Sequence, residues 1–223
     1  MSAREAILGK VRAALNVGEG DAQRATLVAA RLKKAPRGVI PARGQLPQAE
    51  RVALFCTMAE KLSASVERVK SADAVPKAVA AYLRHRNLPA SLRMGADKRL
   101  RAMPWDKQRA LQVKSGASDG DDEVGLSHAT AAVAETGTLV MESGKGNPTT
   151  INFLPEHHIV VVDAADVDGD LETALARIRK RFGKGEMPRT VNLISGPSRS
   201  GDIEQKIILG AHGPRALHLI VVG

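Results

Sequence analysis

Short apolar runs alternate with helical apolar patterns from residue 48 onward, and this alternation constrains the fold more than any other feature. The apolar spacing predicts helices over residues 48–64, 74–86 and 170–182. Apolar and β-branched runs predict strands at residues 66–69, 91–94, 111–113, 139–142, 158–162, 191–194 and 216–222. Strands that alternate with helices typically form a parallel sheet covered by helices. The sequence therefore predicts an α/β fold.

The first 47 residues do not follow this alternation. Ser2 and Glu5 have the spacing of a capping box for a helix over residues 2–15, which carries one apolar stripe. A basic segment without a clear apolar face follows, and residues 35–47 contain the prolines and glycines typical of a linker or an extended arm. We expect a helical extension and linker over residues 1–47 and an α/β domain over residues 48–223. The extension is a candidate docking or oligomerisation element.

Charge and aromatic content limit the classes of partner. The formal net charge is +9, and residues 1–112 hold 22 Lys and Arg against 9 Asp and Glu. Such a basic half could meet nucleic acid, an acidic partner or anionic lipid, but its charges are dispersed at helical spacing, which favours an ordinary solvated surface. Aromatic residues make up only 2% of the chain, so platforms for base stacking are nearly excluded. We therefore expect no nucleic-acid partner.

Cysteine usage and the apolar runs indicate the compartment. Cys56 is the single cysteine, which excludes an internal disulfide and any CxxC metal or cluster site. Its apolar neighbours favour a buried structural role. The first residues are charged, and no apolar run approaches membrane length. We expect no signal peptide, no membrane span and a cytoplasmic location.

A loop of small polar residues is the first candidate site. Residues 195–202 read Ser-Gly-Pro-Ser-Arg-Ser-Gly-Asp, after the predicted strand 191–194 and before a helical pattern of Ile203, Ile207 and Ile208. A strand, a loop of small residues and a helix present backbone N–H groups to an anion, and Ser198 and Arg199 would add donors. The loop matches neither GxGxxG nor GxxxxGK[ST]. The alternative is an ordinary connection to a helix capped by Ser200 or Asp202.

Carboxylates offer a second candidate. Glu135 lies between the small-residue run 129–134 and Gly137, just before a predicted strand. A carboxylate in tight apolar surroundings is a candidate base, acid or nucleophile, and the alternative is a carboxylate held by backbone N–H groups in a turn. The acidic run 119–123 has no EF-hand spacing, and we expect it to form a solvated loop.

The histidines do not show metal-ligand spacing, so we predict no metal site. His158 and His218 open apolar runs, where a satisfied core histidine is the usual outcome. His212 differs because it lies in the turn Gly210-Ala211-His212-Gly213-Pro214, from which it could point into a cleft. A hydrolase triad with Ser195 or Ser198 is disfavoured because no GxSxG elbow is present.

Four blocks of residues, taken together, closely resemble the LutC/YkgG family of LUD-domain proteins. They are Ala134-Glu135-Thr136-Gly137-Thr138-Leu139-Val140, Asn152-Phe153-Leu154-Pro155 with His158-Ile159, Ser195-Gly196-Pro197-Ser198-Arg199 with Asp202-Ile203-Glu204, and Gly210-Ala211-His212-Gly213-Pro214. The blocks occur in the family's order and approximate spacing and cover residues 124–222 tightly. The start of the chain, Ser2 to Leu8, also looks like the start of LutC-type members of the family.

The resemblance implies an open, Rossmann-like sheet similar to the sugar-phosphate isomerase and CoA-transferase superfamily (NagB/RpiA/CoA transferase-like). It also implies a role in oxidising L-lactate to pyruvate beside two partner proteins, of which at least one carries iron–sulfur clusters. One cysteine cannot hold a cluster, so we expect no redox cofactor on this chain. His128-Ala129-Thr130 departs from a Gly-Ala-Asp stretch of many relatives, which weakens any mechanism with two acids. Ser200-Gly201-Asp202 departs from Thr-Ala-Asp but keeps the hydroxyl and the acid.

The expected function is therefore that of a non-iron–sulfur subunit of an L-lactate oxidation system that binds a small anion. The alternatives are a stand-alone CoA-transferase-like or isomerase-like enzyme and an assembly or regulatory subunit, and a homo-oligomer is compatible with each. Glu135 is the candidate catalytic residue. The expected ligand-binding residues are Thr136, Gly137, Thr138, Ser195, Gly196, Ser198, Arg199, Ser200, Asp202, Glu204, His212 and Gly213. The residues alone leave open whether this chain makes or breaks a bond.

Overall fold

The chain forms two compact units, Met1–Val39 and Ile40–Gly223, each of which is described by itself. The structure is a computed structural model that describes residues 2–18, 20–34, 37–183, 185–203 and 206–223. Within these residues, no helix has both the length and the apolar character needed to cross a bilayer.

The first unit consists of two helices, α1 (Ala3–Ala14) and α2 (Ala22–Lys34). The predicted capping box of α1 is confirmed, because the Glu5 N–H donates to Ser2 Oγ at 3.3 Å and the Ser2 N–H donates to Glu5 Oε2 at 2.6 Å. Helix α2 was not predicted, since its apolar residues are sparse. It begins after Asp21, whose Oδ1 accepts the Arg24 N–H at 3.0 Å.

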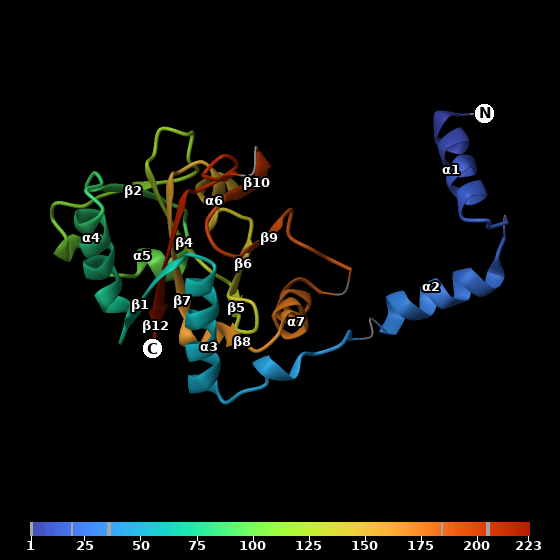
Figure 1. The fold of residues 1–223 in the computed structure, drawn as a ribbon, viewed down its shortest axis with the longest axis horizontal. Coiled ribbons are helices and arrows are strands. Elements are labelled where there is room, and N and C mark those ends of the chain that lie inside the picture. The colour runs from blue at the N-terminus through green and yellow to red at the C-terminus, as the bar shows by residue number, and fades with distance from the viewer. Residues whose placement is uncertain (1, 19, 35–36, 184, 204–205) are drawn as a thin grey trace. The chain divides into compact units, whose positions relative to one another are not determined.

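The second unit is built on a six-stranded parallel sheet with the order β1-β12-β7-β4-β2-β3 (Figure 1). The strands are β1 (Ser65–Val69), β2 (Ser91–Met94), β3 (Gln112–Ser115), β4 (Val124–His128), β7 (His157–Asp163) and β12 (Ala216–Val222). Every pairing in this sheet is parallel, so the predicted α/β class with an open Rossmann-like sheet is confirmed. Strand β4 was not predicted.

Helices cover both faces of the parallel sheet. Side chains of β7 alternate between two cores: Val160 and Val162 pack with Phe55, while Ile159 and Val161 pack with Val79. Phe55 belongs to α3 (Gln48–Lys61) and Val79 to α4 (Val75–His85). The remaining helices are α5 (Lys98–Arg101), α6 (Thr149–Phe153) and α7 (Leu171–Phe182), with short 3₁₀ turns at Ala42–Gly44, Ala72–Ala74, Trp105–Lys107 and Ala164–Asp166. The predicted helices over 48–64, 74–86 and 170–182 are confirmed within a few residues.

A second, four-stranded sheet has the order β8-β5-β6-β9. Its strands are β5 (Ala131–Val133), β6 (Thr138–Glu142), β8 (Val167–Asp168) and β9 (Val191–Ile194). One face packs into the α3 core through Ala132, Leu139 and Met141, and the other packs against α7 through Val133 and Val140. Residues 191–194 form a strand as predicted, but β9 pairs antiparallel with β6, so the expectation that this strand belongs to the parallel sheet is wrong.

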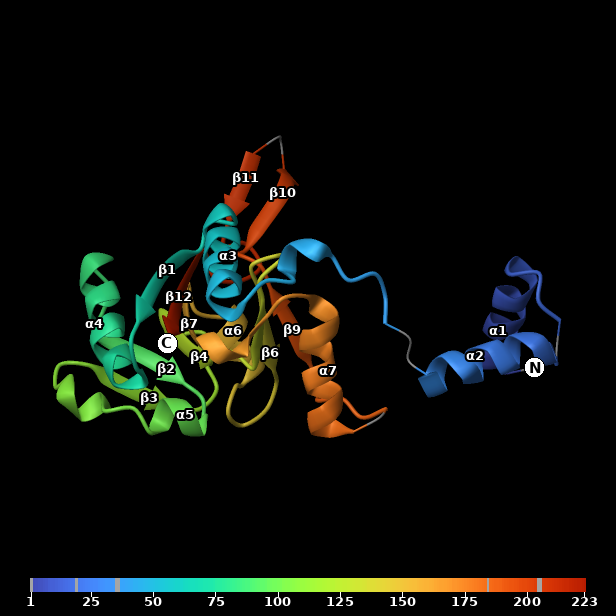
Figure 2. The ribbon, with the colours of Figure 1, turned by 90° about the horizontal axis from the view of Figure 1, so that it is seen from below.

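The segment after β9 forms a hairpin, and the predicted helix is wrong. Strands β10 (Arg199–Ile203) and β11 (Lys206–Leu209) pair antiparallel, with Arg199 opposite Leu209. Figure 2 shows this hairpin projecting from the body of the second unit. The isoleucines at 203, 207 and 208 also fit a strand because β-branched residues pack well on a pleated surface. There is thus no helix N-terminus at this loop and no helix for Ser200 or Asp202 to cap; Glu204 lies outside the described residues.

The acidic run 119–123 is not simply solvated, because Asp122 is buried. Arg93 Nε donates to Asp122 Oδ2 at 2.7 Å, and Ser118 Oγ donates to the same oxygen at 3.1 Å. Burial raises the pKa of Asp122, but these hydrogen bonds outweigh it, so the pKa lies below its usual value. The carboxylate ties the loop before β4 to the neighbouring strand β2.

Replacing Gly137 by alanine should destabilise the fold. Gly137 has φ +67°, and a Cβ there would lie 2.6 Å from Ala59 N and 2.7 Å from Met58 C of α3. The left-handed backbone and the overpacking together should cost about 2–4 kcal/mol. Urea unfolding of Gly137→Ala measures this, with Gly144→Ala as control, because a Cβ at Gly144 has nothing within 4 Å. Equal stability of the two variants would contradict the packing of this turn on α3.

Candidate functional site

Three of the four sequence blocks meet at one cavity of about 280 Å³. The elements around it are α6, the start of β7, the end of β9, the start of β10 and the segment before β12. Residues that line the cavity are Asn152, Phe153, His158, Leu193, Ile194, Ser195, Gly196, Pro197, Ser198, Arg199, His212, Gly213, Pro214 and Leu217. Six expected ligand-binding residues therefore lie together: Ser195, Gly196, Ser198, Arg199, His212 and Gly213.

The turn after β9 is fixed by its neighbours. Gly196 has φ +77°, and a Cβ there would collide with the Leu62 carbonyl, so this turn requires glycine. Ser195 Oγ lies 2.7 Å from Thr138 Oγ1, which lies 2.7 Å from Thr136 Oγ1. This chain of hydroxyls connects the cavity to the turn between β5 and β6. Thr136, Gly137 and Thr138 themselves do not line the cavity.

Ser198 holds the turn that carries His212. The Ser198 N–H donates to the Pro214 carbonyl at 2.8 Å, and the Gly210 N–H donates to the Ser198 carbonyl at 3.1 Å. The His212 N–H donates to Ser198 Oγ at 3.3 Å. Three contacts from one residue thus join the two blocks, and they place the exposed His212 at the rim.

A neutral histidine forms part of the cavity wall. His158 is buried, and its Nε2 lies 3.0 Å from Ser127 Oγ, which donates to Asn152 Oδ1 at 3.3 Å. Burial lowers the pKa of His158 to about 3, so the imidazole is neutral at physiological pH. Asn152 Nδ2 is buried and has no hydrogen-bond partner among the described residues. The wall therefore includes an unsatisfied donor.

Asn152, Phe153 and His158 were not among the expected ligand-binding residues. Their block was recognised in the sequence, and His158 was correctly expected to be a core histidine. The signal that could have found them is the joint occurrence of this block with the loop at residue 195.

Glu135 does not lie in this cavity. Its Oε1 accepts the Leu171 N–H at 3.4 Å at the start of α7, and its Oε2 lies 4.0 Å from Arg43 Nε. One backbone N–H thus contacts this carboxylate, and Glu135 Oε2 is buried without a hydrogen-bond partner among the described residues. Glu135 is therefore not among the residues that line the cavity with the loop at residue 195.

The expected residues of the hairpin begin with Arg199, which also lines the cavity. Arg199 Nη2 donates to the Leu62 carbonyl at 2.7 Å and to Ser63 Oγ at 2.5 Å, so its guanidinium is bound to the end of α3. Ser200 and Asp202 follow it on β10.

The described lining residues supply donors and no carboxylate. Hydroxyls, the imidazole of His212 and the unpaired amide of Asn152 all favour a ligand with acceptor atoms, above all an anion. In the part of the chain that the structure describes, no group of three or more His, Cys, Asp or Glu residues could hold a metal ion.

The two sheets, the hairpin and this cavity define an α/β protein of the open Rossmann-like class. The LUD domain family model matches residues 52–222, and the chain belongs to this family.

The most informative relatives are bacterial proteins named "Lactate utilization protein C". The chain is 32% identical to that of Shouchella clausii over 118 residues (53% of this chain, 51% of the relative) and 38% identical to that of Geobacillus thermodenitrificans over 119 residues (53% and 49%). The chain spans about half the length of these curated relatives. The resemblance seen in the sequence is thereby confirmed.

A solved structure supports the fold alone. It is a DUF162 family protein from Deinococcus radiodurans, with a TM-score of 0.61 and 21% identity over 80% of this chain and 99% of that one.

Stability should fall in acid because His158 is buried neutral. Its folded pKa of about 3 lies below the unfolded value, so below roughly pH 6.5 only the unfolded chain binds this proton, and stability is lost as the pH falls from there toward 3. The contribution to the slope is about 1.4 kcal/mol per pH unit. Urea unfolding of His158→Gln between these pH values should show a slope smaller by that amount.

The exposed His85 provides the matched control, and His85→Gln should keep the wild-type slope. Equal slopes for wild type and His158→Gln would contradict the burial of a neutral imidazole at this position.

Proposed function

We propose that this chain is a non-iron–sulfur subunit of an L-lactate oxidation system, and that its cavity binds a small organic anion. The observation that carries the proposal is a cavity built from three of the recognised blocks, rich in donors, with no carboxylate among the described residues lining it. Membership of the LUD domain family and relatives named "Lactate utilization protein C" support the role in lactate utilisation.

The cavity suits a small carboxylic acid. The hydroxyls of Ser195 and Ser198 and the side chain of His212 would donate to the carboxylate, because charge-assisted hydrogen bonds of this kind are strong. Phe153 and Leu217 offer apolar surface for a methyl group. A ligand with one charged and one apolar end would thus contact both the hydrogen-bond donors and the apolar surface.

Electron transfer would fall to the partner proteins. Oxidation of L-lactate to pyruvate removes two electrons and two protons, which need an acceptor. Cys56 is half-buried on α3, and burial raises the pKa of its thiol, so it stays protonated near neutral pH. His158 is a poor base at neutral pH because its pKa is about 3. In this proposal the chain binds and orients the anion, holds no redox cofactor itself, and works beside iron–sulfur proteins.

Exposed apolar side chains near the cavity support a subunit role. Phe153 and Leu193 line the cavity, and Leu154 and Leu209 line a second hollow that shares His212 with it. All four side chains are exposed by 43–52%. Apolar groups gathered in this way mark protein contact surfaces, so a partner docked here would also close the cavity from water.

A docking or assembly role of the first unit is the second candidate. Along α1, the apolar stripe of Ile7, Leu8 and Val11 is exposed, and no residue of this helix is buried. Such a stripe is typical of a helix that packs on a partner. In the alternative of a CoA-transferase-like or isomerase-like enzyme, Glu135 would be the nucleophile or base, but it does not line the cavity at Ser198.

Deleting the gene should abolish growth on L-lactate, and variants of the cavity should fail to restore it. We expect Ser198→Ala and His212→Ala to lower lactate-dependent oxygen uptake about tenfold, because each loses a donor to the anion. His85→Ala, on the exposed end of α4, is the control and should restore growth fully.

The two parts of the proposal fail separately. Unchanged growth of the deletion strain on L-lactate would overturn the role in lactate oxidation. Full complementation by both cavity variants, with growth lost in the deletion strain, would overturn the ligand site and leave the subunit role.

A further inference from the structure

A second and larger cavity, of about 580 Å³, opens at the carboxyl ends of the parallel strands. Residues Ala96 to Arg99 follow β2 and line one side, and His128 at the end of β4 lines another. No described residue is shared with the cavity at Ser198.

This cavity lies where the connections of two neighbouring strands diverge. Strands β2 and β4 are neighbours in the sheet. The next strand of this sheet after β2 is β3, which lies beyond β2, whereas the next one after β4 is β7, which lies in the opposite direction along the strand order. In open α/β sheets such a switch point leaves a crevice outside the carboxyl ends of the strands, and ligands bind there. The topology therefore marks this cavity as a ligand site independently of any sequence motif.

Two buried residues that line the cavity each carry an acceptor atom for which the described residues supply no donor. Glu142 Oε2 accepts from Arg181 Nη1 at 2.7 Å, but Glu142 Oε1 has no hydrogen-bond partner among the described residues. Asn147 Nδ2 donates to the Glu142 carbonyl at 3.2 Å, whereas its Oδ1 is likewise unpaired in the described part. Both residues are only 8% exposed and both line the cavity. Buried acceptors without donors are rare in native proteins, so they indicate a ligand that carries hydroxyl or amino groups.

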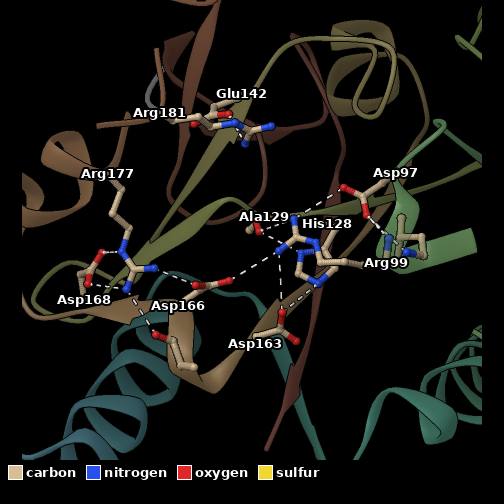
Figure 3. A network of polar contacts seen from close by, with 12 residues as sticks. Asp97, Arg99, His128, Ala129, Glu142, Asp163, Asp166, Asp168, Arg177 and Arg181 are labelled. Atoms are coloured by element: carbon tan, nitrogen blue, oxygen red, sulfur yellow. Dashed lines mark hydrogen bonds and ion pairs between the residues drawn. The ribbon is translucent and has the colours of Figure 1, made fainter. Parts of the chain in front are cut away.

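Cationic side chains stand near the carboxylates of this cavity. Arg99 lies 3.5 Å from Asp97 and Asp166 and 3.7 Å from Asp163, all longer than the roughly 2.7–2.9 Å of a direct charged hydrogen bond. Figure 3 shows Arg99 beside His128 and Asp97, with Glu142 and Arg181 in another part of the network. Arg99 Nη2 also donates to the Ala129 carbonyl at 3.4 Å, which is again a long contact. Lys98 is exposed and lines the same cavity, so two cations would be available to a ligand anion.

An aromatic ring completes the lining. Phe182, at the end of α7, borders the cavity, and the Arg181 guanidinium lies 5.7 Å from its ring centre. A ring of this kind gives a planar base a surface on which to stack. The volume lies within the range of about 300–1,000 Å³ typical of sites for small organic ligands.

We propose that this cavity binds a nucleotide, with its phosphate on Lys98 and Arg99, its ribose hydroxyls donating to Glu142 and Asn147, and its base against Phe182. A carboxylate that accepts from ribose hydroxyls is the usual partner of that sugar at a switch point. Each of the three chemistries is supplied by a different part of the chain: Lys98 and Arg99 by α5, Glu142 and Asn147 by the end of β6 and the turn after it, and Phe182 by the end of α7.

Isothermal titration calorimetry of the full chain with adenosine 5′-monophosphate tests the proposal. Saturable binding is expected, and adenosine and inorganic phosphate, each tested alone, should bind at least about tenfold more weakly because each lacks one group of contacts. Arg99→Gln and Glu142→Gln should each weaken binding of the nucleotide by about tenfold. Arg101→Gln, on the same helix but outside the cavity lining, should leave it unchanged.

The contradicting results are equally definite. Absence of saturable heat with the nucleotide at millimolar concentration would overturn the site. Equal affinity for inorganic phosphate would show an anion site without nucleotide recognition, and equal weakening by Arg99→Gln and Arg101→Gln would show a general charge effect. Far-UV circular dichroism of each variant confirms that a loss of binding is not a loss of fold.

Discussion

The pairing of strand β7 with β4 on one side and β12 on the other is the interaction on which the rest of the structure depends. Its register runs from His157 opposite Val124 and Ala216 to Asp163 opposite Val222. Parallel strands are buried on both faces, so the backbone N–H and C=O groups of β7 find their hydrogen-bond partners within the sheet. Its apolar side chains pack in the two cores, one on each face. The helices α3 and α4 are held in place by these cores.

The two ends of β7 lead to the two cavities. At its start, His158 forms part of the wall of the cavity at Ser198, where burial keeps the imidazole neutral. At its end, the Asp163 carboxylate lies 3.5 Å from His128 Nε2 and 3.7 Å from Arg99 Nη1, two residues that line the other cavity. The strand thus has a neutral imidazole at its start and a carboxylate beside a guanidinium at its end. The two cavities therefore suit two different ligands.

The sequence predicted those elements whose signal is local. Helices α3, α4 and α7 and strands β1, β6, β7 and β12 have clear periodicity. Strand β5 was missed because three small residues, Ala131 to Val133, carry almost no pattern of their own. Strand β4 was missed because Gly125, Ser127 and His128 are atypical of a strand and are buried only through contacts with distant parts of the chain. The β10–β11 hairpin was mistaken for a helix because its apolar spacing fits both structures.

Local sequence signals also indicated part of the candidate site. Ser195, Ser198 and His212 line one cavity because hydrogen bonds join the turn at Ser198 to the turn at His212. Glu135 does not join them: its position follows from the β5–β6 turn packing on α3, a contact between residues far apart in the sequence. No local pattern could have indicated that Gly137 rests on the backbone of Ala59.

The proposed site for a small organic anion is the cavity at Ser198 and His212, and not the region of Glu135. Titration of the ¹⁵N-labelled protein with L-lactate and with pyruvate, followed by amide chemical shifts, tests it most directly. We predict saturable shifts at the amides of Ser198, His212 and Gly213. Unchanged amides at these three residues, or saturable shifts confined to Gly137 and Leu171, would contradict it.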